Sequence, residues 1–277
     1  MHVHTPSVIP SAMFIDAATA ARIDRVEARL SLAVAAPIEH AFITALHGGA
    51  SVVARPGSPI NKIIGVGFDT VLDERVLADI EAGWRARGEP VRVELATLAL
   101  PAVAEQLGAR GYRLAGFEHV LVRPISGADA AVTPPHPVHR EHPEWHHLLV
   151  DGFATPDGTG VPVDDYSRET IDAAMTDFAR ADGFHRYVAA VDGAPAGAAT
   201  MRIDDGIALL CGATTLPTAR RRGVQAALLA ARLRDASHAG CEYAAITTAP
   251  GSRSQHNAVR HGFHLAYARA ILVQPTP

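Results

Sequence analysis

The sequence predicts an α/β (α+β) protein of two similar domains, each with a mixed, mostly antiparallel sheet flanked by helices. The chain has 277 residues, 48% of them hydrophobic, which is enough for two cores of ordinary size. Residues 111–124 (GYRLAGFEHVLVRP) also align with residues 262–275 (GFHLAYARAILVQP) at an offset of 151 residues. Continued upstream, this offset predicts that a strand, a helix and a closing strand occur twice. Two unrelated segments that each end in an apolar strand are the alternative.

The stretch between the two copies is rich in proline, which fixes φ and disfavours helix and sheet. We therefore expect a first domain over 1–125, a linker over 126–143 and a second domain over 144–277.

The second domain has a regular pattern that predicts the element order ααβββαβαβ. Asp192-Gly193 and Asp204-Asp205-Gly206 are turn sequences that separate three antiparallel strands. Gly240 and Gly262 are placed to end helices. The expected helices cover 144–151, 168–181, 223–238 and 252–261, and the expected strands cover 184–191, 196–203, 207–215, 243–248 and 263–273.

Composition and charge exclude several classes of function. The formal net charge of -4 gives no basic field for nucleic acid or an anionic membrane, so we expect neither as a partner. The first thirty residues lack the unbroken apolar run of a signal peptide, and the sequence is expected to be cytoplasmic. Lys62 is the only lysine, which indicates a GC-rich, bacterial gene. Cys211 and Cys241 are too few for a disulfide framework.

Five histidines gather in and after the linker, where imidazoles can in principle share a metal ion. They are His136, His139, His142, His146 and His147. No cysteine lies nearby and no regular structure is expected to orient them, so we predict a solvated segment and no metal site.

The segment after the strand 207–215 has the features of an anion site. Leu216-Pro217-Thr218-Ala219 leads into three arginines, Gly223 and a long helix. The first N–H groups of a helix have no partner inside it, and the helix dipole adds positive charge there. Gly223 allows close approach of a phosphate, and Arg221 and Arg222 can contact its oxygens. A basic loop that merely precedes an ordinary helix is the alternative. A nucleotide site of the G-x-x-x-x-G-K-[ST] type is not indicated, because that pattern is absent.

This arrangement resembles the GNAT superfamily of Gcn5-related N-acetyltransferases, whose motif reads P-x-x-R/Q-x-x-G-x-G/A between a strand and a helix. Here it is Pro217-Thr-Ala-Arg220-Arg-Arg-Gly223-Val-Gln225. The resemblance covers about 144–277 and includes Ser254 and the pair Gly262-Phe263. It implies two GNAT-like domains and acetyl-CoA as co-substrate. The implied contacts are Ala213, Thr214 and Thr215 for the pantetheine arm, the amides of Arg221, Arg222, Gly223, Val224, Gln225 and Ala226 for the pyrophosphate, and Ser254 and Asn257 on the following helix. For Ser254 and Asn257, helix packing or capping is an equal alternative.

The sequence departs from the family at three places. Gln225 replaces a usual small residue, although the backbone amides do not depend on that side chain. No acid lies in 207–215, and Glu242 only begins the next strand, so the usual base is missing. Ala258 stands where relatives often have a tyrosine acid. No catalytic residue is therefore assigned.

The first domain has no comparable loop, because the offset places Asp69, Thr70, Val71 and Leu72 on 220–223. Gly65 and Gly67 alone are more typical of a strand bend. We expect a degenerate GNAT-like domain that braces the second.

The resemblance implies an N-acetyltransferase acting on an amine of a small molecule or peptide. A non-catalytic acyl-CoA-binding or sensor protein is the alternative. Asp157, Asp164 and Asp165 suggest a site for a cationic amine, with solvated loop acids as the alternative. The acceptor itself, the acyl chain preference and the oligomeric state do not follow from the sequence.

Overall fold

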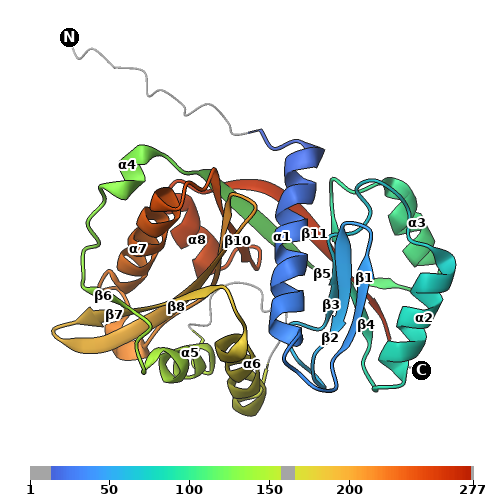
Figure 1. The fold of residues 1–277 in the computed structure, drawn as a ribbon, viewed down its shortest axis with the longest axis horizontal. Helices are drawn as coiled ribbons and strands as arrows, with labels where there is room; N and C mark the ends of the chain where they lie inside the picture. Colours follow the sequence, from blue (N-terminus) through green and yellow to red (C-terminus); the bar gives the residue numbers. More distant parts are fainter. Residues whose placement is uncertain (1–13, 157–165, 276–277) are drawn as a thin grey trace, which may run out of the picture.

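The computed structural model describes residues 14–156 and 166–275 (Figure 1). The first half of the chain contains, in order, α1 (Ala17–Ala35), β1 (Phe42–Leu46), β2 (Gly49–Val53), β3 (Lys62–Ile64), α2 (Glu74–Arg85), β4 (Val91–Ala96), α3 (Pro101–Ala109) and β5 (Arg113–Pro124). Two short elements follow, α4 (Gly127–Ala130) and β6 (Val138–Arg140). The second half contains α5 (Trp145–Phe153), α6 (Arg168–Arg180), β7 (Phe184–Val191), β8 (Ala194–Asp204), β9 (Ile207–Thr215), the 3₁₀ turn η1 (Pro217–Ala219), α7 (Val224–His238), β10 (Tyr243–Thr248), α8 (Arg253–Arg260) and β11 (His264–Gln274).

The predicted fold class and the order ααβββαβαβ of the second half are confirmed, and β7, β9 and β10 have the predicted bounds. The predicted recurrence of strand, helix and strand is also observed. The offset of 151 residues places β4, α3 and β5 on β10, α8 and β11 to within one residue at each boundary.

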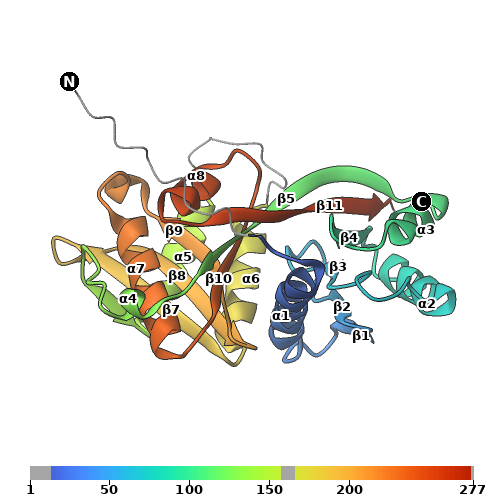
Figure 2. The same ribbon diagram turned by 90° about the horizontal axis from the view of Figure 1, so that it is seen from above.

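The strands of the described residues form one continuous sheet of eleven strands, in the order β1-β2-β3-β4-β11-β5-β10-β9-β8-β7-β6. In each half the closing strand pairs with the other half: β5 pairs with β10, and β11 pairs with β4, both antiparallel. The two closing strands also pair with one another in the middle of the sheet. Figure 2 shows β5 and β11 running side by side from one half into the other. The halves have therefore exchanged their last strands.

Two short elements form inside the predicted linker, where proline was expected to disfavour them. β6 pairs with β7 at the end of the sheet, with Val138 opposite Ala189. Proline is tolerated next to an edge strand because one side of that strand needs no donor. α4 packs on α7.

Helices cover both faces of the second half's strands (Figure 1). Apolar residues of α7 and α8 pack on one face, and those of α5 and α6 pack on the other. α1 comes from the first half, yet it packs on β2, β9 and α6. Side chains on several sides of α1 are buried, which is typical of a helix enclosed by the core. No helix in the described ranges is long and apolar enough to cross a membrane.

A group of charged side chains is buried between α1 and the central strands; we call it the ionic cluster. Its members come from five elements and are Asp24, Glu27, Lys62, Glu94, Glu118 and Arg269. Arg269 is fully buried; its guanidinium donates to Asp24 Oδ1 at 2.6 Å and to Glu27 Oε2 at 2.7 Å. Lys62 Nζ donates to Glu94 Oε2 at 2.9 Å.

The ionic cluster joins the two halves, because Arg269 lies on β11 and its carboxylate partners lie on α1. Burial raises the pKa of Glu27, but Arg269 and Lys62 outweigh burial and bring this pKa down to about 2. Glu27 is therefore a carboxylate at neutral pH, and its charge depends on Arg269.

Replacing Arg269 by Met should lower the free energy of unfolding by about 3–5 kcal/mol, because buried carboxylates lose their cation. Arg25→Met is the matched control, since Arg25 and Asp69 form an exposed pair worth about 1 kcal/mol or less. Urea unfolding of the full chain measures both. A loss below about 1 kcal/mol for Arg269→Met would contradict the joining role of the cluster.

Candidate functional site

The segment between β9 and α7 makes a tight, irregular turn. Arg221 has φ +62°, a left-handed value that is uncommon outside glycine. Gly223, the N-cap of α7, has φ +83° and ψ +5°. When a residue in the left-handed conformation is followed by helical residues, their successive N–H groups point to the same side, and this arrangement favours the binding of an anion.

The N-terminus of α7 has no side-chain cap. The Ala227 N–H donates to the Gly223 carbonyl at 3.0 Å. Because the helix begins at Val224, the N–H groups of Val224, Gln225 and Ala226 have no acceptor inside it. The equivalent helix of the first half, α2, is capped: the Asp73 carboxylate accepts from the N–H groups of Arg75 at 2.8 Å and Val76 at 3.0 Å. The two halves therefore differ at the predicted anion site.

The arginine side chains before α7 have separate environments. Arg222 donates to Asp192 Oδ2 at 2.6 Å, and Arg220 donates to the Thr155 carbonyl. Arg221 is exposed and, among the described residues, has no ion-pair partner. His136 of the linker bonds the Arg222 carbonyl through Nε2 at 2.6 Å. Of the three side chains, Arg221 is the one available for an added anion.

β9 and β10 separate close to this turn. The two strands are parallel and pair from Tyr243 with Ile207 to Ala245 with Leu209. Residues 210–215 of β9 and 246–248 of β10 have no pairing with one another; we call this region the β9–β10 divergence. The backbone edges that face each other there are free to hydrogen-bond an extended ligand, as the edge of a sheet does for an added strand.

Gly212 marks a bulge in β9. β8 pairs Ala199 with Ala213 and Thr200 with Cys211, so Gly212 is unpaired, and its φ is +49°. An extra residue reverses which side of the sheet the following side chains face. In the sequence, the one sign of this bulge is a single glycine inside an apolar strand, and the bulge was not predicted.

Beyond the bulge, the predicted residues Ala213, Thr214 and Thr215 face alternate sides. Thr214 Oγ1 donates to the Leu148 carbonyl of α5 at 3.1 Å, so its side chain is directed away from α7. Ala213 packs in the core with α7, and Thr215 Oγ1 accepts from Gln225 Nε2 at 3.1 Å. Gln225, the unusual residue of the motif, thus connects the start of α7 to the end of β9. The Leu216 N–H donates to the Ala196 carbonyl of β8 at 3.0 Å, so alternation along β9 directs the backbone of Thr214 toward β8 and the backbone of Ala213 and Thr215 toward the divergence.

Ser254 and Asn257 lie on α8, which contacts β10 and β5. Ser254 is exposed and Asn257 is half-buried. The Asn257 carbonyl receives a hydrogen bond from His261 at 2.8 Å, whereas Ala258 is buried in the core. Ser252 caps the helix by accepting from the Gln255 N–H at 3.1 Å, so capping is not the role of Ser254 or Asn257.

Glu242 and Cys211 are poorly placed or poorly activated for catalysis at the divergence. Glu242 lies at the other end of β10 and receives a hydrogen bond from Arg22 at 2.8 Å. Burial raises the pKa of the Cys211 thiol to about 12, so this thiol stays protonated at neutral pH. Cys211 and Cys241 are both free.

The histidines after residue 135 are dispersed. His147 lies 2.9 Å from Asp151, His146 lies 3.7 Å from Asp172, and the rings of His139 and His142 are 6.0 Å apart. Across the described part of the chain, no three His, Cys, Asp or Glu side chains are arranged to hold a metal ion.

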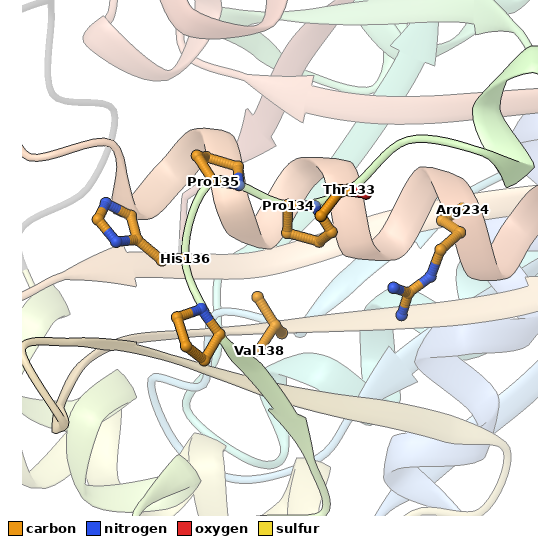
Figure 3. A pocket seen from close by; sticks show the side chains of 7 residues that line it. Thr133, Pro134, Pro135, His136, Val138 and Arg234 are labelled. Carbon is orange, nitrogen blue, oxygen red and sulfur yellow. The ribbon is translucent and has the colours of Figure 1, made fainter.

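A hollow of about 390 Å³ lies beside α7. Figure 3 shows the proline-rich segment running along the helix, with His136 near one end of the hollow and Arg234 near the other. It is lined by Thr133, Pro134, Pro135, His136, Pro137, Val138 and Arg234, none of which belongs to the β9–β10 divergence. Asp157, Asp164 and Asp165, predicted as a possible site for a cationic amine, lie outside the described residues.

The comparisons with known proteins agree with these features. Residues 143–263 match the model of the acetyltransferase (GNAT) family. No curated protein matches the sequence. A GCN5-related N-acetyltransferase from Kribbella flavida is similar in structure, with a TM-score of 0.65 and 18% identity, over 96% of this chain and 98% of that one.

Two further structures share the fold over a smaller part of the chain. A conserved protein of unknown function from Staphylococcus epidermidis has a TM-score of 0.54 and 11% identity, over 73% of this chain and 79% of that one. A tandem GNAT protein from the clavulanic acid biosynthesis pathway has a TM-score of 0.52 and 12% identity, over 73% and 69%. Residues 143–263 thus match the GNAT family in sequence, and the chain has a fold found in GNAT proteins, including a tandem one.

Proposed function

We propose that the protein is an acetyl-CoA-dependent N-acetyltransferase that acts on an amine of a small molecule or peptide. One observation supports this most strongly: the uncapped, glycine-led N-terminus of α7 follows directly from the strand that separates from β10. A pyrophosphate needs the former, and an extended pantetheine arm needs the latter.

In this proposal the pyrophosphate accepts hydrogen bonds from the N–H groups of residues 221–226, and Arg221 adds its charge. The pantetheine arm pairs with the free backbone edge of residues 213–215. Ser254 and Asn257 of α8 are polar and lie beyond the free end of β10, where they can contact the same ligand.

Transfer is proposed to be direct. With Cys211 protonated, there is no thiolate in the divergence to form an acyl-enzyme. The acceptor amine attacks the thioester carbonyl, the C–N bond forms, and the C–S bond breaks to release the thiolate. Backbone N–H groups of β9 near the Gly212 bulge can stabilise the oxyanion that forms meanwhile.

The first half is proposed to bind no acyl-CoA. Asp73 occupies the N–H groups at the start of α2, and its carboxylate places a negative charge where a phosphate would lie. Arg25 forms an ion pair with Asp69 at 2.7 Å, so the Arg25 cation is not free to bind a phosphate either.

Calorimetry should find one acetyl-CoA bound per chain, and addition of primary amines should then release free thiol from it. The physical reason is that, of the two equivalent helices α2 and α7, only α7 begins without a side-chain cap on its N–H groups. Two molecules bound per chain would contradict the assignment to the second half. Tight binding without thiol release on any mono-, di- or polyamine would favour a sensor instead.

Gly223→Ala should weaken acetyl-CoA binding at least tenfold. A Cβ at φ +83° is strained and would lie 3.2 Å from His136 Nε2, so the turn must shift and misalign its N–H groups. Gly240→Ala is the matched control: this glycine has φ +74°, has open space around it and follows the other end of α7. Equal losses of affinity in the two variants would indicate strain alone.

A further inference from the structure

Neither β9 nor the start of β10 offers the proposed reaction an unpaired acid as proton acceptor. An amine is protonated at neutral pH and must lose a proton before it attacks. β9 carries no acid, and Glu242 is paired with Arg22 at the far end of β10. A base can instead come from an element that lies against the free end of β10.

The strand exchange places Glu118 next to the free end of β10, across β10 from β9. β5 pairs with β10 up to His119 opposite Thr248, so Glu118 is the next residue beyond the free end of β10. Its side chain is on the same sheet face as Val120 and Val122, which pack in the core beneath α1. Thr247 of β10, opposite Val120, is on this face too, because its hydroxyl donates to Glu27 of α1 at 3.3 Å.

Glu118 has an unsatisfied carboxylate oxygen. Oε2 is buried and has no hydrogen-bond partner among the described residues. The nearest cation is Arg269 Nη1 at 3.8 Å, which already donates to Glu27. The side chain keeps 17% of its surface exposed, so it is not sealed in the core. The exposed part does not include Oε2, so a proton reaches this unpartnered acceptor by rotation of the carboxyl group or through a water molecule.

The charges around Glu118 determine the pKa of its carboxyl group. The cluster members that face it are Arg269 from β11, Glu94 from β4, Lys62 from β3, and Asp24 and Glu27 from α1. Burial and the negative charge of Glu94 raise the pKa of Glu118, Lys62 and Arg269 oppose them, and the resulting pKa is about 7. Glu27, whose pKa is about 2, is too weak a base for the same task.

We propose that Glu118, on the closing strand of the first half, accepts the proton from the acceptor amine at the site of the second half. This rests on the proposed function. The ammonium N–H bond breaks and the carboxyl O–H bond forms; the neutral amine then attacks the thioester carbon. The second amine proton goes to the departing thiolate, and Glu118 later releases its proton to water.

The proposal gives the first half a chemical role. By the offset of 151 residues, the counterpart of Glu118 is Arg269, and the two face each other in the β5–β11 pair. The repeat thus has a carboxylate in one copy and a guanidinium at the same position in the other. Of the two strands, only β5, which carries the carboxylate, lies next to β10.

The test uses Glu118→Gln, which keeps the shape and removes the proton-accepting oxygen. With the best amine of the panel, kcat/KM of the wild type should rise with pH and level off above an inflection near pH 7. In Glu118→Gln it should fall roughly 10²-fold or more and lose that inflection. Binding of acetyl-CoA should not change. The control is Glu105→Gln, an exposed glutamate of α3.

Glu118→Asp provides the second variant, in case the amide disturbs folding. It keeps a carboxylate and should retain the inflection with a smaller loss of kcat/KM. A Glu118→Gln protein that binds acetyl-CoA and keeps its rate and pH profile overturns the proposal and leaves the proposed function intact. A wild type that binds acetyl-CoA and acetylates no amine contradicts the function itself, and the assignment of Glu118 with it.

Discussion

The antiparallel pair of β5 and β11 is the contact on which the rest of the structure depends. Each strand closes the half of the chain that does not contain it, so neither half has a complete sheet alone. The buried Arg269 stabilises this arrangement further, because it brings β11 against the carboxylates of α1. A buried ion pair of this kind favours one arrangement over others more than it adds stability, since desolvation offsets much of its attraction.

The site of the second half depends on this exchange in two ways. β5 covers the side of β10 that β11 would otherwise occupy, which leaves β10 free to separate from β9 only on its other side. α1 then closes the face opposite α7, so the divergence is bordered by elements of both halves. The first half therefore contributes walls and charges even though the start of its own α2 is capped by Asp73.

Local pattern predicted much of this fold. The turn pairs at Asp192-Gly193 and Asp204-Asp205 fixed three strands, and Gly223 and Gly240 bounded α7 to within a residue. The repeat correctly indicated two copies of strand, helix and strand. It was unable to predict the exchange, because β5 and β11 share an apolar strand pattern and that pattern does not indicate which of β4 and β10 each one pairs with.

The candidate site was predicted less completely. The loop before α7 is local in sequence, so its glycine and arginines were enough to predict it as an anion site. The Gly212 bulge reverses the facing of Thr214, which alternation alone cannot show. The role proposed for Glu118 does not follow from the sequence, because its position near the free end of β10 depends on a strand pairing over more than a hundred residues.

The most direct test of this account is a crystal structure of the full chain with coenzyme A. The account predicts one molecule per chain, with its pyrophosphate on the N–H groups of residues 221–226 and its thiol between β9 and β10, on the side where Glu118 lies. Coenzyme A bound at the start of α2, or along the proline-rich hollow beside α7, would contradict it.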